Sequence, residues 1–402
     1  MIDLPPRRSG PRWGRIAGLG LAAFVLGGLV GWVADGDDGT VSTAGTVSTA
    51  GVGDPSATTT PANGAVPGSP ATTAAPTTVD PDAPPASQTG SGQPVTFVFG
   101  GDIHFDGPLA TTLSSAPDTL LAGLQPTLRD ADVAVVNLET AIGTGGTKAA
   151  KEFNFRAPPA AFGALTSAGV DVIGMANNHA LDYGQSGLTE TLAAASAAKA
   201  PVIGVGENEA AALRPWTTTV NGQRISVIAA TSVLDANLIA DWTATADHPG
   251  VASAKRVDQL VAAVAAARAV SDTVVVFLHW GTEATFCANA NQLDLAPRLV
   301  DAGADLVIGG HAHRVLAGGY VGHAYVDYGL GNLVFKASSG DGRDTGLLRV
   351  TATGRRIDAA EWLPGRIGGS YLPSLLTGSD RDAELATWHS RRACSKLADA
   401  PS

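Results

Sequence analysis

Short runs of β-branched and apolar residues alternate, from Pro94 onward, with alanine-rich segments of helical period. The runs that predict strands cover residues 95–99, 133–136, 170–173, 202–205, 225–230, 273–278 and 305–308. Helices are predicted over residues 188–200, 255–270 and 292–302. This alternation is typical of an α/β layered domain. Because the strand runs are largely continuous apolar stretches, and do not alternate regularly with polar residues, they indicate sheets that are covered on both faces.

A different pattern occupies the N-terminus. Residues 16–34 carry no charged side chain, and a helix over them would span roughly 28 Å, close to the ~30 Å hydrocarbon core of a bilayer. The basic segment 1–15 precedes this stretch and aspartates follow it. This predicts a single-pass anchor in the cell membrane with a cytoplasmic N-terminus and an extracellular C-terminal domain. A cleaved signal peptide is the alternative, with an imperfect site at Ser42-Thr43-Ala44.

The segment 35–93 consists almost entirely of Thr, Ala, Ser, Gly and Pro, and residues 40–51 repeat the hexapeptide TVSTAG. Such a composition cannot bury enough apolar surface to offset the entropy of ordering the chain. We therefore expect a disordered linker that separates the membrane from a folded domain over 94–370, which a C-terminal tail, 371–402, follows.

The composition narrows the class of protein. An apolar content of 45% excludes disorder over the whole chain. The formal charge of -11 argues against binding to nucleic acid, which needs an excess of Lys and Arg to displace counterions. Only two cysteines are present, Cys287 and Cys394, so a miniprotein held by disulfides is excluded. In an oxidising exterior these two would form one disulfide, and two free buried thiols are the alternative.

Carboxylate, amide and imidazole side chains follow five of the predicted strands at the point where each strand ends. In chain order these are Asp102 and His104, Glu139, Asn178 and His179, His279, and His311 and His313. A single His or Asn at such a place is usually a loop hydrogen-bonder. The carboxyl ends of strands in α/β sheets converge on one crevice, so the eight together predict a common site. His248, His323 and His389 lack this context, and we expect them to be surface or structural residues.

Imidazole and carboxylate ligands without thiolate suit Mn, Fe or Zn. Two divalent metal ions about 3.5–4 Å apart can share a bridging carboxylate, activate water and stabilise the charge of a transferring phosphoryl group. A histidine beside the metals can protonate the leaving oxygen. The residue types therefore predict a dimetal hydrolytic site of the phosphoesterase type.

The same segments resemble the calcineurin-like metallophosphoesterase superfamily, and more closely its CapA family of poly-γ-glutamate capsule biosynthesis. The resemblance covers residues 95–335, and its motifs are Gly101-Asp102, 137–140, 176–184, 279–281, 302–313 and 328–335. It implies a four-layer α/β/β/α sandwich, here preceded by one transmembrane helix and the linker.

The resemblance also implies a role for each residue. The first metal would be held by Asp102, His104 and His313, and the second by Asn178, His279 and His311; Glu139 would bridge them and His179 would be the general acid. The sequence departs from the pattern of the superfamily at Glu139, where most members have Asp, and at Ala176-Asn177, which replaces the usual Gly. His104 completes an Asp-x-His motif that many capsule-branch proteins lack.

Three basic residues are weaker candidates for substrate contacts. Lys151 and Arg156 follow Glu139 in a loop, where a solvated loop face is the favoured alternative. Arg314 is adjacent to His313 and is the better candidate by proximity alone.

Two functions are consistent with these patterns. The first is a membrane-anchored, extracytoplasmic CapA-like protein of capsule biosynthesis whose dimetal site hydrolyses a phosphoester substrate or an anionic cell-surface polymer. The second is a non-catalytic factor for polymer binding, export or assembly that retains the metallophosphoesterase fold. The resemblance also implies a capsule synthase complex at the membrane as a partner, and no nucleic acid is expected.

Overall fold

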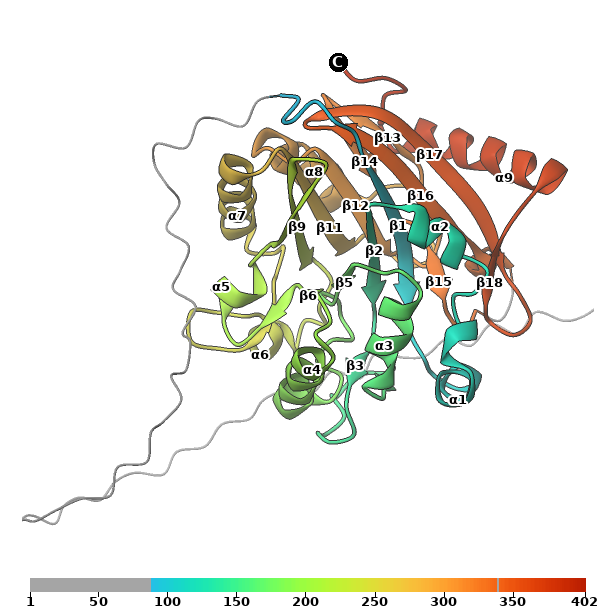
Figure 1. The fold of residues 1–402 in the computed structure, drawn as a ribbon. Helices are drawn as coiled ribbons and strands as arrows, with labels where there is room; N and C mark the ends of the chain where they lie inside the picture. The colour runs from blue at the N-terminus through green and yellow to red at the C-terminus, as the bar shows by residue number, and fades with distance from the viewer. Residues whose placement is uncertain (1–87, 338–339) are drawn as a thin grey trace, which may run out of the picture. The chain divides into compact units, whose positions relative to one another are not determined.

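The computed structural model describes residues 88–337 and 340–402, in which two large sheets are flanked by helices (Figure 1). The first sheet has the strand order β18 (Pro373–Leu375), β17 (Arg356–Ile367), β16 (Asp344–Thr353), β1 (Val95–Ile103), β2 (Val133–Leu138), β5 (Val172–Gly174) and β6 (Val202–Ile203), with β15 (Asn332–Val334) also paired to β1. The second has the order β13 (Gly318–Val321), β14 (Ala324–Asp327), β12 (Leu306–His311), β11 (Thr273–Trp280), β9 (Gln223–Thr231) and β8 (Trp216–Val220).

The remaining elements are short strands and the helices. Two small sheets pair β10 (Gly250–Val251) with β7 (Val205–Gly206) and β3 (Ala141–Ile142) with β4 (Arg156–Ala157). The α-helices are α1 (Pro108–Ser115), α2 (Gln125–Asp130), α3 (Ala160–Ser167), α4 (Gly184–Ala198), α5 (Glu209–Ala212), α6 (Ile239–Trp242), α7 (Val257–Val270), α8 (Ala290–Asp301) and α9 (Gly378–Ser390). Short 3-10 turns lie at Pro117–Thr119, Gly340–Arg343 and Arg391–Cys394.

Three buried clusters define the layers of the fold. Phe97 and Phe99 of β1 pack against Val275 and Phe277 of β11 in the cluster between the two sheets. Val98, on the opposite face of β1, lies instead in a cluster with residues of α1 to α4. A third cluster joins the outer face of the second sheet to α7 and α8. The described chain is therefore a mixed α/β fold in which helices cover the outer faces of two stacked sheets.

The predicted helices and all but one of the predicted strands are present, with shifted ends; the run 202–205 is divided between β6 and β7, which belong to different sheets. The apolar strand runs are buried on both faces; every residue of β2 and β11, for example, is buried. Helix α8 begins at a capping box, in which Asn289 and Gln292 each accept a hydrogen bond from the other's backbone N–H. The strand pattern did not predict the long hairpin of β16 and β17. The segment 371–402 contributes β18 to the first sheet and forms α9, whose Trp388 is buried beside Trp362.

The parallel strands of both sheets end in the same region, which positions the predicted ligands. β1, β2 and β5 are parallel in the first sheet, and β9, β11 and β12 in the second. The pairing of β1 with β2 shifts register at Gly101, so that Asp102 lies beside Asn137 at the strand ends. A Cβ atom at Gly101 would collide with the carbonyl oxygen of Gly331. Only glycine therefore fits this bulge, which carries Asp102 into the site.

The predicted anchor over 16–34 and nearly all of the linker over 35–93 lie outside the described residues. Within 88–337 and 340–402, no helix has both the length and the apolar character that crossing a bilayer requires.

Cys287 and Cys394 form a disulfide, which decides between the two alternatives for the thiols. The bond joins the loop between β11 and α8 to the 3-10 turn after α9. The C-terminal segment is thereby tied to a loop that follows His279.

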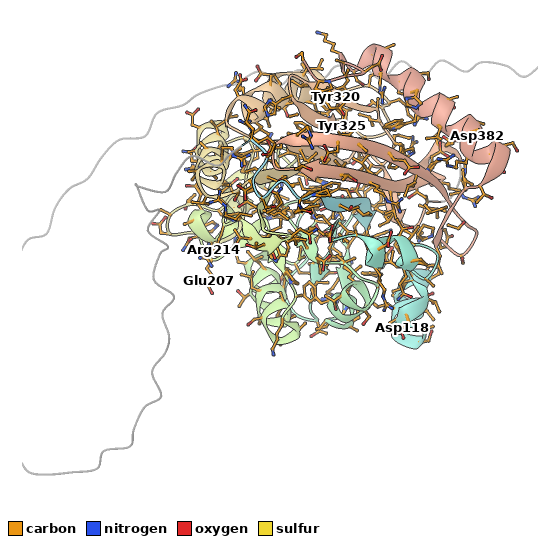
Figure 2. The ribbon with its side chains drawn as sticks, turned by 45° about the horizontal axis from the view of Figure 1, so that its top comes forward. Asp118, Glu207, Arg214, Tyr320, Tyr325 and Asp382 are labelled. Atoms are coloured by element: carbon orange, nitrogen blue, oxygen red, sulfur yellow. A yellow bond between two sulfur atoms is a disulfide. The ribbon has the colours of Figure 1, made fainter. Side chains whose placement is uncertain are left out.

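Asp327, the last residue of β14, is a buried carboxylate that is not one of the predicted ligands. Its Oδ1 accepts a hydrogen bond from the backbone N–H of Gly329 at 3.0 Å, and its Oδ2 has no partner among the described residues. Tyr325 of the same strand packs edge-on against Tyr320 of β13, with ring centroids 5.3 Å apart (Figure 2). Burial raises the pKa of Asp327 from 3.8 to about 7.

This shift predicts how stability depends on pH. Between about pH 4 and pH 7 the folded protein holds the proton of Asp327 while the unfolded chain has lost it, so the free energy of unfolding falls as pH rises, by up to ~1.4 kcal/mol per pH unit. We expect Asp327→Asn to remove this contribution. In urea titrations at pH 4.5, 6 and 7.5, the variant should gain stability relative to the wild type as pH rises. A constant difference between the two proteins would contradict this expectation.

Candidate metal centre

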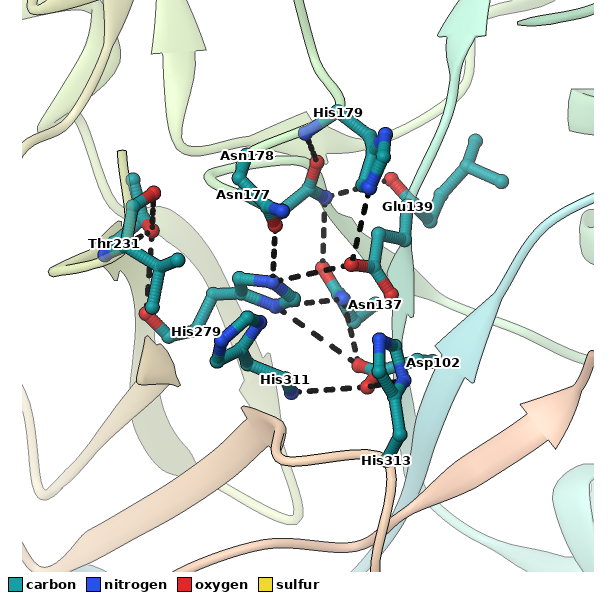
Figure 3. Close-up of polar contacts among 12 residues, drawn as sticks. Asp102, Asn137, Glu139, Asn177, Asn178, His179, Thr231, His279, His311 and His313 are labelled. Carbon is teal, nitrogen blue, oxygen red and sulfur yellow. Dashed lines mark hydrogen bonds and ion pairs between the residues drawn. The ribbon is translucent and has the colours of Figure 1, made fainter. Parts of the chain in front are cut away.

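The predicted ligands meet between the ends of the two sheets (Figure 3). Asp102 comes from β1, Glu139 directly follows β2, and Asn178 follows β5; His279 is the penultimate residue of β11, and His311 is the last residue of β12. Three groups of side chains have ligand atoms within 4.8 Å of one another: Glu139, His279 and His311; Asp102, Glu139 and His313; and Glu283, His311 and His313. Both sheets thus contribute to one cluster, with Glu139 common to two of the groups.

Glu139 is the residue whose environment most clearly calls for a cation. Its carboxylate is fully buried, and neither oxygen has a hydrogen-bond partner within the described part of the chain. Its backbone N–H donates to the carbonyl of Ile103 at 2.7 Å, which fixes it against β1. A buried carboxylate without donors costs several kcal/mol unless a positive charge lies beside it.

Two further ligand atoms face this carboxylate. Nε2 of His279 lies 3.2 Å from Oε1 of Glu139 and 2.7 Å from Oδ1 of Asn178. Neighbouring ligands of one cation, with bonds of about 2.1 Å, are separated by roughly 3 Å. The donor types and spacings therefore fit a divalent cation.

His311 is held in an unusual backbone conformation, with φ 87. Its backbone N–H donates to Oδ2 of Asp102 at 2.9 Å, and its buried Nδ1 has no partner. Burial, together with the positive charges of His279 and His313, keeps the pKa of His311 well below its ordinary value. The ring is therefore neutral, which is the form that binds metals.

Asp102 and His313 form the other side of the cluster. Asp102 accepts a hydrogen bond from Nδ2 of Asn137 at 2.8 Å, and Nδ1 of His313 lies 3.5 Å from its Oδ2. Burial disfavours the charged form of Asp102, but the contact with His313 and the charges of His279 and His313 prevail and lower its pKa to about 2. A Cβ atom at Gly310 would lie 2.5 Å from Oδ1 of Asp102, so the glycine before His311 leaves room for this carboxylate.

The ring of His313 is oriented by Asn332, a residue that sequence reasoning left without a role. Nδ1 of His313 donates to Oδ1 of Asn332 at 2.8 Å, and Nδ2 of Asn332 donates to the carbonyl of Gly342, which fixes the amide. Although burial opposes it, the charges of Glu139 and Asp102 raise the pKa of His313 to about 9. Binding of a metal at this ring would therefore release a proton.

His104 is not in any of the three groups of ligand atoms. Its Nε2 accepts a hydrogen bond from the backbone N–H of Lys336 at 2.9 Å, and its ring packs on Phe335. Burial and the positive charges of His179, His313 and Lys336 lower the pKa of His104 to about 3. This hydrogen bond occupies Nε2, whereas Nδ1 is buried and has no partner among the described residues. The group of Asp102, Glu139 and His313 does not include His104.

His179 lies beside the cluster and is oriented by Asp182, which sequence reasoning did not single out. Nδ1 of His179 donates to Oδ2 of Asp182 at 2.6 Å, while Nε2 lies 4.0 Å from Oε1 of Glu139. The side chains of Asn177 and Asn137 connect this turn to Asp102, because Asn177 donates to Oδ1 of Asn137 at 3.0 Å. The signal for Asp182 was its place in the motif 176–184, three residues after His179.

Lys151 belongs to the same network, so the expectation of a solvated loop face is wrong for this residue. Its side chain is only 7% exposed, and its Nζ lies 2.9 Å from Oδ1 of Asp182. It also donates to the carbonyl of Asn178. Lys151 thus neutralises the carboxylate that orients His179.

Removing this ammonium should destabilise the fold. Lys151→Met leaves the buried carboxylate of Asp182 without its ion-pair partner, and we expect a loss of about 3 kcal/mol in the free energy of unfolding. The matched control is Lys148→Met, an exposed lysine of the same loop, for which a change within ~0.5 kcal/mol is expected. Urea titrations of both variants test this; equal stabilities would show that the ion pair contributes nothing.

The other two basic candidates contact the protein itself. Arg156 donates to the carbonyl of Thr144 at 2.9 Å and stacks its guanidinium 4.0 Å from the ring centroid of Tyr183. Arg314 donates to the carbonyl of His313 at 2.8 Å. A half-buried aromatic residue, Phe155, also lines the site, stacked on His179 with ring centroids 4.2 Å apart.

The three histidines set apart by the sequence analysis are in none of the groups of ligand atoms. His248 lies 3.0 Å from the carbonyl of Asp241, and His323 lies 2.7 Å from Nη2 of Arg355. His389 is exposed and contacts the ring of Trp388.

Comparison with known proteins finds relatives named for capsule and polymer synthesis. A probable polyglutamine synthesis accessory protein of Mycobacterium tuberculosis is 34% identical over 190 residues, which cover 46% of this chain and 50% of that protein. The capsule biosynthesis protein CapA of Bacillus anthracis is 32% identical over 206 residues, 50% of this chain and 49% of that protein. The chain thus spans about half the length of these curated relatives.

A solved structure of a phosphatase from Mycoplasma pneumoniae shares 13% identity, with 68% of this chain and 93% of that one covered and a TM-score of 0.44. The family model described as bacterial capsule synthesis protein PGA_cap matches residues 96–337, which hold all the predicted ligands. This match covers more than half of the chain, and the chain therefore belongs to the PGA_cap family of bacterial capsule synthesis proteins.

Proposed function

We propose that this CapA-like protein is a metal-dependent hydrolase of the phosphoesterase type, held at the outer face of the membrane, that acts on a phosphoester or an anionic polymer of the cell surface. The observation that carries the proposal is the buried carboxylate of Glu139, which has no hydrogen-bond donor and faces His279, His311 and His313. Such an arrangement is costly without a cation and useful with one.

The donor atoms are sufficient for two sites. Asp102 and His313 would hold one divalent ion, His279, His311 and Asn178 the other, and Glu139 would be shared. When bound, a pair of Mn, Fe or Zn ions polarises phosphoryl oxygens and lowers the pKa of water.

The protonation of the leaving group falls to residues of the chain. Asp182 accepts a hydrogen bond from Nδ1–H of His179, which leaves Nε2 directed toward the cluster. The imidazolium form would donate its Nε2 proton to the leaving oxygen and keep the Nδ1 proton that Asp182 holds. The ammonium of Lys151 lies 2.9 Å from Oδ1 of Asp182, and Phe155 limits the access of water on one side of the ring.

The test is hydrolysis by the purified full chain after loading with Mn²⁺. Substrates are an alkyl and an aryl phosphate monoester, an aryl phosphate diester, and poly-γ-glutamate. Elemental analysis of the same sample gives the metal content. Metal-loaded protein that turns over none of these substrates would defeat the proposal of catalysis.

A second function, polymer binding or assembly without catalysis, is favoured by the position of His104. Its Nε2 accepts a hydrogen bond from the N–H of Lys336 and is not directed to the groups of ligand atoms. The discriminating experiment is complementation of a deletion strain by wild type and by His179→Ala, with surface polymer as the readout. Equal restoration supports binding, whereas restoration by the wild type alone supports hydrolysis.

The proposed location at the membrane rests on the sequence pattern of residues 1–34. The proposed association with a capsule synthase complex rests on the resemblance to the family. Fractionation of cells, with protease added outside, tests the topology. Degradation of the C-terminal domain in intact cells is expected, and its protection would exclude the extracellular location.

A further inference from the structure

The loop that follows β11 carries an acidic residue, Glu283, to the exposed side of the metal centre. A carboxylate oxygen of Glu283 and a ring nitrogen of each of His311 and His313 lie within 4.8 Å of one another. Glu283 is exposed, whereas His311 is only 5% exposed and its buried Nδ1 has no partner. Glu283 was not among the ligands that the strand ends predicted.

The backbone around Glu283 is held in place from one side by the turn that bears the two histidines. The N–H of Ala284 donates to the carbonyl of Ala312 at 2.9 Å, and Ala284 has a positive φ of 57. A non-glycine residue in this conformation is uncommon and needs support from its surroundings. The hydrogen bond gives that support and places Glu283 beside the His311-Ala312-His313 turn.

The other side of the loop is fastened to the rest of the chain. The disulfide joins Cys287 to Cys394, and the guanidinium of Arg391 lies 4.3 Å from the ring centroid of Phe286. Asn289, which caps α8, donates through Nδ2 to the hydroxyl of Thr282 at 3.1 Å. The segment on either side of Glu283 is thus fixed, although its carboxylate is open to solvent.

We infer that Glu283 is an additional ligand of the metal centre, on its solvent side, and that the Cys287–Cys394 disulfide keeps the loop where this carboxylate can bind. The inference rests on the proposed metal centre. Asp102 and Glu139 supply two carboxylates from the buried side, and Glu283 adds a third. A third carboxylate favours Mn²⁺ and similar hard ions over Zn²⁺.

The first test is calorimetric titration of the full-length, metal-free protein with Mn²⁺. Glu283→Gln is expected to weaken binding of one Mn²⁺ ion about tenfold or more. The matched control is Glu207→Gln, an exposed carboxylate at the edge of the molecule (Figure 2), which should bind as the wild type does. Wild-type affinity and stoichiometry in Glu283→Gln would overturn the inference. Absence of Mn²⁺ binding by the wild type would overturn the metal centre itself.

The second test addresses the disulfide. The double variant Cys287→Ser/Cys394→Ser should bind the same Mn²⁺ ion more weakly, and adding Glu283→Gln to it should cause little further loss, because the two changes remove one interaction. Losses that multiply would show that the disulfide and Glu283 act separately. Circular dichroism of each metal-free variant establishes that the fold is retained.

Discussion

His179→Gln is expected to lower the turnover of an alkyl phosphate by roughly 10²–10⁴-fold, the usual contribution of a positioned general acid. The variant should bind Mn²⁺ as the wild type does, because His179 is outside the three groups of ligand atoms. Glutamine keeps a hydrogen-bonding side chain but cannot supply a proton to a leaving oxygen. The variant should therefore have a lower kcat and the same metal content as the wild type.

The leaving group separates this role from a role in binding. An alkoxide needs protonation far more than a nitrophenolate, so the loss should be much smaller for an aryl phosphate with an acidic leaving group. Steady-state kinetics on both substrates measure this, with His389→Gln, an exposed histidine, as the control. Equal losses for the two leaving groups would assign His179 to substrate binding.

Glu139→Gln is expected to reduce the affinity for Mn²⁺ by at least about a hundredfold, since the change removes the ligand that both sites share. Loss of metal should remove turnover as well. In the metal-free protein, by contrast, Glu139→Gln should be a favourable change and should stabilise the fold. The fully buried carboxylate accepts no hydrogen bond there, although the rings of His279 and His313 lie near it. We expect its burial to cost more than the attraction of these rings returns, so a neutral side chain of the same shape should raise the free energy of unfolding by about 1–3 kcal/mol.

Elemental analysis, with and without Mn²⁺, tests the loss of metal. Urea titration, with and without Mn²⁺, tests the change in stability. Glu152→Gln, an exposed residue of the loop that follows, is the control and should change neither quantity. A metal-free Glu139→Gln that is less stable than the wild type would mean that the carboxylate has a stabilising partner. Full metal content in this variant would remove Glu139 from the centre.

The sequence predicted correctly those features of the fold that depend on a single strand. The apolar runs predicted the central strands, and residues at their ends, such as Asp102, Glu139 and His279, do converge, because parallel strands carry their carboxyl ends to one region. The hairpin of β16 and β17 was not predicted. These strands contain charged residues such as Arg349 and Glu361, and their sheet position depends on pairing with β1, which local periodicity does not contain.

The features that the strand-end pattern does not contain depend on partners distant in the sequence. Nε2 of His104 is occupied by the backbone N–H of Lys336, which no strand-end pattern indicates. Lys151 is buried because Asp182 lies across from it, and a charged loop residue without visible partners is ordinarily solvated. Glu283 follows His279 by four residues, and only the turn at Ala312 places it near the histidines.

Because the proposed ligands are divided between the two sheets, metal binding would be a late step of folding. The first sheet presents Asp102, Glu139 and Asn178, and the second presents His279, His311 and His313. Neither half alone offers a complete coordination sphere, so a cation could be captured only after the sandwich has closed. The free energy of metal binding would then stabilise the contact between the two sheets. The amount of folded protein would therefore depend on the concentration of the ion in the compartment.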